Sequence, residues 1–108
     1  MENNFEYNAG EDILYIYNTT EPFPITGSIV CNNLIFDVAS SGEVIGMQVE
    51  NASKYLGTSP ENLERIKEAK IRVMTNQGAI VIGWKISAEG INSINTFMLP
   101  KNKIALNC

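Results

Sequence analysis

Hydrophobic and polar residues alternate along much of this chain, with the period of two that is typical of a β-strand with one buried face. Within residues 43–50, Ile45, Met47 and Val49 point to one side, and the residues between them point to the other. Residues 79–86 repeat the pattern, with an apolar side made of Ile80, Ile82, Trp84 and Ile86. We expect this side to lie in the core or in a dimer interface, including the side chains of Trp84, Ile80 and Ile82. For Trp84 the alternative is a platform on which a substrate would stack.

Turn residues divide the pattern into about eight short strands. Asn32-Asn33 fits a two-residue hairpin turn, because asparagine tolerates the left-handed backbone that such turns need. The nearly continuous apolar run over residues 13–17 predicts a strand that is covered on both faces. The expected strands are residues 5–7, 12–17, 25–31, 34–38, 43–50, 70–75, 79–86 and 92–99.

Helix signals are confined to the middle of the chain. Asn51 fits the N-cap of a short helical turn that Gly57 would end. Ser59 offers a second N-cap oxygen and Pro60 suits the first helical position, so one short helix is expected near residues 60–68.

The strands and the helix together predict the fold class. One helix among many strands, with no strand–helix–strand rhythm, favours an α+β, mostly β fold of antiparallel meanders. The length favours a single domain over residues 1–108. Its two parts would be a β-rich part, residues 1–57, and a helix with a second meander, residues 58–108.

The net charge of −4 hides an uneven distribution. Residues 1–50 contain eight carboxylates and no lysine or arginine, whereas residues 51–108 contain eight basic and four acidic residues. Residues 1–50 therefore carry a charge of −8 and residues 51–108 a charge of +4, which sum to −4. Such parts attract each other within a fold or across a dimer, and the acidic part would repel nucleic acid. The basic cluster is expected to be a solvated face, with an anion site as the alternative; its members are Arg65, Lys67, Lys70 and Arg72.

Composition argues against several kinds of chemistry. The chain has no histidine, which removes the commonest general base and a common metal ligand. We therefore expect no catalytic residues, no metal and no cofactor. Cys31 is expected to be a buried thiol and Cys108 part of a frayed tail; the alternative is a disulfide between them, which a reducing cytoplasm disfavours. The polar N-terminus differs from a secretory signal and no apolar run is long enough to cross a bilayer, so a cytoplasmic protein without membrane attachment is expected.

Tyrosines and carboxylates are the candidate functional residues. Tyr15 and Tyr17 are two apart, so they share one side of a strand, and with Tyr7 they would line a groove or half-cover a sheet edge. A second set of candidates, Asp12, Asp37 and Glu43, flanks turns. Two of these carboxylates brought together would hold a divalent cation or form an acid–base pair, whereas separate ones would bond to turn amides.

Part of the chain resembles a known family of small prokaryotic proteins, the domain of unknown function 2283 family. The matching positions are Tyr7-Asn8, Asp12–Ile16, Asp37, Gly42, Val44–Val49 and Ala52-Ser53. The resemblance covers about the first half and implies a small β-rich fold with no established activity. Two family carboxylates are replaced, by Asn8 and Gln48, which weakens an enzymatic interpretation.

Two functions remain as hypotheses. The first is a non-enzymatic, homo-oligomeric interaction module with a protein partner, in which a second copy covers apolar strands. The second is a small-ligand-binding or carboxylate-dependent hydrolytic domain. The expected ligand or partner surface consists of Asp12, Tyr15, Tyr17, Asp37 and Gln48.

Overall fold

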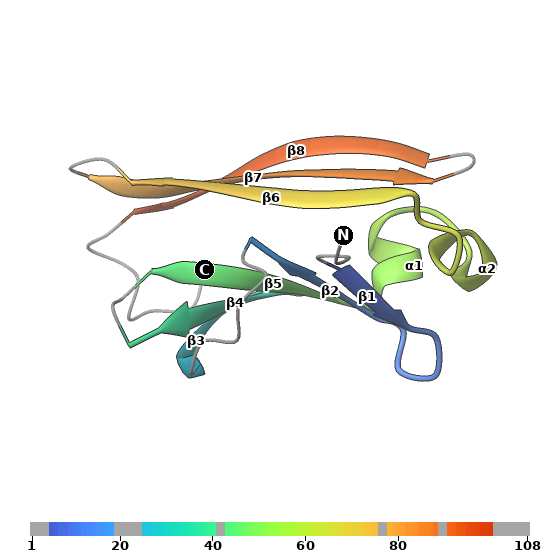
Figure 1. Ribbon diagram of the computed structural model, residues 1–108, viewed down its shortest axis with the longest axis horizontal. Helices are drawn as coiled ribbons and strands as arrows, with labels where there is room; N and C mark the ends of the chain where they lie inside the picture. The colour runs from blue at the N-terminus through green and yellow to red at the C-terminus, as the bar shows by residue number, and fades with distance from the viewer. Residues whose placement is uncertain (1–4, 19–24, 41–42, 76–77, 89–90, 101–108) are drawn as a thin grey trace.

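Two antiparallel β-sheets face each other, with two short helices at one end of the space between them (Figure 1). The computed structural model describes residues 5–18, 25–40, 43–75, 78–88 and 91–100. The first sheet has the strand order β1-β2-β5-β4-β3, and the second has the order β6-β7-β8. The strands are β1 (Phe5–Asn8), β2 (Ile13–Tyr17), β3 (Ile25–Cys31), β4 (Leu34–Ala39), β5 (Val44–Glu50), β6 (Glu68–Thr75), β7 (Ala79–Ala88) and β8 (Ile91–Pro100). The predicted antiparallel, mostly β, α+β fold is confirmed.

Local turn chemistry behaves as the sequence predicts at the β3–β4 hairpin. Asn32 has a φ of 54°, the left-handed conformation that asparagine tolerates. The neighbouring amide of Glu50 donates to the carbonyl oxygen of Asn33 at 2.8 Å, which ties this turn to β5. The turn residues 41–42, 76–77 and 89–90 lie outside the described residues.

Both helices are single turns, α1 (Ala52–Tyr55) and α2 (Pro60–Leu63). The amide of Asn62 donates to Ser59 Oγ at 3.2 Å, so Ser59 is the N-cap of α2 as expected. The prediction that this helix continues to residue 68 is wrong, because β6 already begins at Glu68. The amide of Lys67 donates to the carbonyl oxygen of Ser87 at 2.8 Å. The residues before β6 therefore pair with β7 and do not form a second helical turn.

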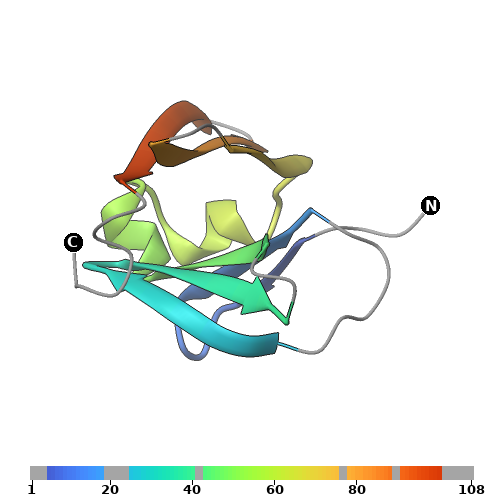
Figure 2. The ribbon, with the colours of Figure 1, turned by 90° about the vertical axis from the view of Figure 1, so that its left-hand side faces the viewer.

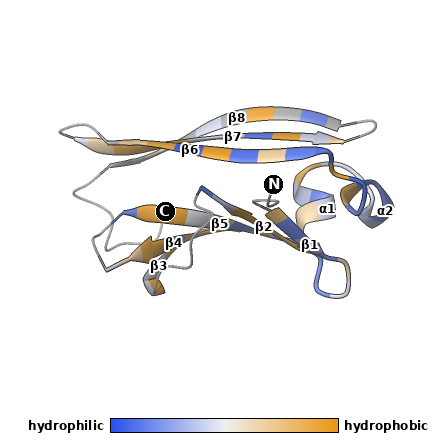
Figure 3. Ribbon diagram, viewed as in Figure 1, coloured by the Kyte–Doolittle hydropathy of each residue, from blue (hydrophilic) through white to orange (hydrophobic). Residues whose placement is uncertain are grey.

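One hydrophobic core joins the two sheets, which lie one above the other in the end-on view of Figure 2. In the first sheet, Leu14, Ile16 and Phe36 are fully buried, and in the second sheet Ile82 and Ile86 are fully buried. Ala52 of α1 and Leu63 of α2 belong to the same core cluster. Hydrophilic and hydrophobic residues alternate along β6 in Figure 3, as expected for a strand with one buried face.

Two details of the strand predictions are wrong. The run 13–17 is not covered on both faces, since burial alternates along β2 and only Leu14 and Ile16 are fully buried. In the β4–β5 pair a β-bulge shifts the register between Asp37 and Val38. Because of this bulge, Val44 joins the core cluster in place of Ile45.

Cys31 is buried as expected, but it is disulfide-bonded and so is not the free thiol that the sequence suggested. Cys108 lies outside the described residues. Disulfides persist mainly in oxidising surroundings, so this bond does not support the cytoplasmic location that the sequence predicts. That location stays a prediction. Within the described residues, neither helix is long enough to cross a membrane.

A matched pair of isoleucines tests the position of the core. Ile82 has no exposed surface, whereas Ile94 on the adjacent strand is 70% exposed. We expect Ile82→Val to lower the free energy of unfolding by about 1 kcal/mol, because a buried methyl group is lost. The same change at Ile94 is expected to stay within about 0.5 kcal/mol of zero. Urea unfolding monitored by Trp84 fluorescence measures both, and equal losses would contradict this core.

Candidate functional site

Four of the five residues predicted to form a ligand or partner surface lie together on the outer face of the first sheet. The strand register places Tyr15 beside Gln48 in one cross-strand row, and Tyr17, Gly46 and Asp37 in the next. Glu6 pairs with Tyr15 and so extends the first row onto β1. We call this outer surface the tyrosine face; its residues are Glu6, Tyr15, Tyr17, Ile35, Asp37, Gly46, Gln48 and Glu50.

Asp37 is a buried carboxylate at the centre of the tyrosine face. It is only 3% exposed, and Gln48 Nε2 donates to both of its oxygens, at 3.0 and 3.2 Å. Gly46 makes this burial feasible, because a Cβ there would lie 3.0 Å from Tyr17 Cδ1 and 3.4 Å from Asp37 Oδ2. The missing side chain lets the Tyr17 ring lie close to the carboxylate. A neutral amide is thus the partner of a buried negative charge.

The electrostatics of Tyr17 reflect the acidic character of this face. Burial raises the pKa of the Tyr17 hydroxyl, and the negative charges of Asp37 and Glu6 raise it further. Residues 1–50 contain no lysine or arginine, so no cation from this part of the chain offsets these carboxylates. Tyr17 therefore stays a neutral hydroxyl that is able to donate and accept hydrogen bonds.

Asp12 lies apart from the tyrosine face, where it anchors the start of α1. Ser53 donates its amide to Asp12 Oδ1 at 3.0 Å and its hydroxyl to Oδ2 at 2.7 Å, and the Tyr7 hydroxyl donates to Oδ1 at 2.5 Å. Asn51 is the N-cap residue of α1, as the sequence predicts, but its side chain makes no cap hydrogen bond. The carboxylate of Asp12, the turn residue directly before β2, accepts these hydrogen bonds at the start of the helix instead.

The hydrogen bonds of Asp12 decide its charge state. Burial alone would raise the pKa of this carboxyl. The hydrogen bonds from Tyr7 and Ser53 outweigh burial and hold the pKa below its ordinary value of 3.8. Burial and the neighbouring Asp12 charge raise the pKa of the Tyr7 hydroxyl, with smaller contributions from Glu64 and Glu61. Asp12 is therefore ionised and Tyr7 neutral at neutral pH.

The remaining sequence candidates are spread over the fold. Tyr7 pairs with Leu14 and packs against the core, so it does not share a face with Tyr15 and Tyr17. Trp84, like Ile80 and Ile82, is buried between the sheets. Sequence reasoning gave no site role to Gly46 or Ser53, although both belong to the positions that carry the family resemblance.

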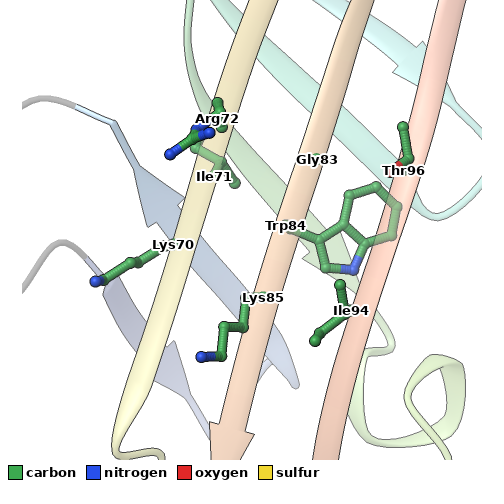
Figure 4. Close-up of a pocket in the computed structure, with 8 residues that line it drawn as sticks. All are labelled: Lys70, Ile71, Arg72, Gly83, Trp84, Lys85, Ile94 and Thr96. Carbon is green, nitrogen blue, oxygen red and sulfur yellow. The ribbon is translucent and has the colours of Figure 1, made fainter.

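The outer face of the second sheet holds a groove of about 390 Å³ (Figure 4), lined by two members of the basic cluster for which the sequence left an anion site as the alternative, Lys70 and Arg72. Its rim carries three cationic side chains, Lys70, Arg72 and Lys85, and its centre is Gly83, which has no side chain to fill the space. Ile94 and Thr96 of β8 form the opposite side, and the buried residues Ile71 and Trp84 border it from beneath. Such a concave, cationic surface suits an anionic group.

The cations of this groove differ in their ion pairs. Glu68 accepts from Lys70 and Lys85, with both N–O distances at 3.1 Å, and these two contacts lower the pKa of Glu68. Among the described residues, Arg72 has no such partner. Its planar guanidinium is left to bind a carboxylate or phosphate from outside the chain.

The carboxylates do not assemble into a metal site within the part of the chain that the structure describes. No group of three His, Cys, Asp or Glu side chains comes together there. Asp12 and Asp37 are held by different neighbours, Ser53 with Tyr7 and Gln48 respectively. What these arrangements offer chemically is recognition, through tyrosine hydroxyls on one face and cations on the other.

Replacing Asp12 by asparagine tests the helix anchor. Asp12 has a φ of 56°, which asparagine tolerates, so the change alters the charge and leaves the backbone unstrained. We expect the free energy of unfolding at neutral pH to fall by about 1 kcal/mol. The exposed neighbour Glu11 provides a matched control, and Glu11→Gln is expected to have little effect.

The pH dependence of the Asp12→Asn effect follows from the lowered pKa. A carboxyl with a folded pKa below its unfolded value stabilises the fold above the unfolded pKa, and this contribution disappears as the pH falls through the folded pKa. The difference in the free energy of unfolding between the parent protein and Asp12→Asn should thus have its full size at neutral pH and shrink below about pH 4. A difference that grows on acidification would contradict the anchor.

Gln48→Glu tests the buried amide–carboxylate pair. The change places a second carboxylate against Asp37, and two such charges so close disfavour joint ionisation. We expect the free energy of unfolding to fall by about 1–3 kcal/mol at neutral pH. The free energy of unfolding should recover on acidification, because protonation of one of the two carboxyl groups removes their mutual repulsion. The double variant Asp37→Asn with Gln48→Glu restores one amide and one carboxylate, and a failure to regain stability would argue against this pairing.

Comparison with known proteins gives one family and one distant relative. A protein of Methanosarcina mazei named "Putative hypoxanthine phosphoribosyltransferase" is 23% identical over 117 residues, which cover 96% of this chain and 93% of that protein. No solved structure matches the chain. Residues 4–53 match the family model described as "Protein of unknown function (DUF2283)", and Tyr7, Asp12, Asp37 and Gln48 all lie in this segment. The first half of the chain therefore carries the DUF2283 family pattern that its residues predicted.

Proposed function

We propose that this protein is a non-enzymatic interaction module that self-associates through the outer face of β6, β7 and β8. The single observation that carries the proposal is a set of apolar side chains exposed on that face: Met74 at 58%, Ile94 at 70% and Met98 at 61%. The register pairs Met74 with Val81 and Val81 with Met98, so three strands contribute to one apolar row. Clustered exposed apolar side chains of this kind are typical of interaction surfaces.

The composition of this face matches that of known interfaces. Methionine and arginine are enriched at protein–protein interfaces, and Arg72 lies beside the apolar row on β6. We call this surface the cationic face; its residues are Lys70, Arg72, Met74, Val81, Gly83, Lys85, Ile94, Thr96 and Met98. The charge and the apolar row together favour a partner with acidic and apolar groups.

The size of the cationic face sets the strength of the contact. The face covers three strands and five residue positions along each strand, or roughly 14 Å by roughly 17 Å, which is about 240 Å². A standard interface contributes about 800 Å² per partner. A contact on this face alone is therefore expected to be transient and concentration-dependent, as in regulatory or reversible assemblies.

A second candidate function uses the groove on the same face for a small anionic ligand. The groove volume of about 390 Å³ falls within the range of small-molecule sites, and three cations line it. The Methanosarcina mazei relative is named for a phosphoribosyl group, which is anionic. Carboxylate-dependent hydrolysis has less support, because the side chains of Asp12 and Asp37 already bind Ser53, Tyr7 and Gln48.

Substitutions at the exposed apolar residues of the cationic face test self-association. Ile94→Thr and Met98→Thr remove exposed apolar surface and keep side chains that suit a strand. We expect each change to weaken self-association, and the pair together to weaken it about tenfold or more. Sedimentation velocity over a wide concentration range gives the dissociation constant. The control is Tyr55→Thr on α1, where a 42% exposed side chain lies outside the cationic face.

The same samples separate the two candidate functions. A parent protein that stays monomeric at every soluble concentration would rule out self-association. Thermal-shift titration with inorganic phosphate would then probe the groove: a saturable rise that Arg72→Gln abolishes supports the ligand-binding function.

A further inference from the structure

The two outer faces of the molecule carry opposite charges. On the tyrosine face, Glu6 and Glu50 present acidic groups at the surface, the carboxyl group of Asp37 is buried beneath them, and residues 1–50 contain no lysine or arginine. On the cationic face, Lys70, Arg72 and Lys85 are basic, and Glu68 partly neutralises the two lysines. Because each face lies on the side of its sheet away from the shared core, the two point in opposite directions (Figure 1).

The faces also match in their apolar groups. The tyrosine face presents the half-buried side chains of Tyr15, Tyr17 and Ile35, and the exposed Val30 continues their sheet. The cationic face presents Met74, Ile94 and Met98. Tyrosine rings against methionine and arginine form favourable contacts, through sulfur–aromatic and cation–π interactions.

We propose that the cationic face of one copy docks on the tyrosine face of another, in a head-to-tail contact. The inference rests on the proposed self-association and identifies the partner surface. A face-to-face pairing of two cationic faces would bring Lys70, Arg72 and Lys85 against their own copies, and this like-charge contact opposes association. In the head-to-tail contact, Arg72 meets carboxylates that have no cation from their own part of the chain.

The geometry has consequences for the assembly. A head-to-tail contact uses two different surfaces, so each bound copy leaves one face of each kind free. Assembly then proceeds to short stacks or rings in place of a two-fold dimer. Because the contact depends on opposite charges at the surface, salt screens it, and association should weaken as ionic strength rises.

Two charge-reversal variants test the direction of the contact. Arg72→Glu damages the cationic face, and Glu6→Lys damages the tyrosine face, where Glu6 is exposed on β1. We expect either variant alone to self-associate about tenfold more weakly than the parent at low ionic strength. An equimolar mixture should form a 1:1 complex, because each variant supplies the face that the other has lost.

Matched controls use the same residue types away from both faces. Arg65→Glu and Glu64→Lys change exposed side chains just after α2 and are expected to leave association unchanged. Circular dichroism and thermal unfolding confirm that each variant is folded. Sedimentation velocity at low and at physiological ionic strength gives the dissociation constants and the size of the mixed complex.

The possible outcomes separate this inference from the proposed function. If Glu6→Lys associates like the parent while Arg72→Glu does not, the cationic face acts without the tyrosine face, and only the head-to-tail inference fails. If the parent does not self-associate at all, both fail. Loss of association in each single variant and its return in the mixture support the inference.

Discussion

The fold depends on the contact between the buried faces of its two sheets. Each sheet has one apolar face, formed by residues such as Leu14 and Phe36 on one side and Ile82 and Ile86 on the other. Neither sheet has another element large enough to cover that face, since the helices within the described residues are single turns. Removing this apolar surface from water is the main force that holds the halves together.

This contact also separates the charges of the molecule. The sheets come from different parts of the chain, so pressing their apolar sides together turns the acidic part and the basic part outwards in opposite directions. The tyrosine face and the cationic face are therefore consequences of the same packing that stabilises the fold. The uneven distribution of charge along the sequence therefore appears in the fold as a difference in charge between the tyrosine face and the cationic face.

The polar contacts of the site depend on the same arrangement. Asp12 reaches Ser53 because β2 pairs with β5 in antiparallel register, which brings Ile13 opposite Glu50. Asp37 lies beside Gln48 because the β4–β5 register runs unbroken from Leu34 opposite Val49 to Asp37 opposite Gly46, which places Gln48 diagonally next to Asp37 on one face. Gly46 then leaves room for Tyr17 at the buried carboxylate.

The sequence by itself determined the strands, the turn at Asn32-Asn33, the helix cap at Ser59 and the grouping of Tyr15 with Tyr17, because these follow from short-range periodicity and turn chemistry. Tertiary structure decided that Asp12 caps α1, that Tyr7 leaves the other tyrosines and that Trp84 lies in the core. It also placed Lys70, Arg72 and Lys85 around a groove. These features require pairing between distant strands, and the alternation of side chains fixes the two faces of a strand without indicating its neighbours.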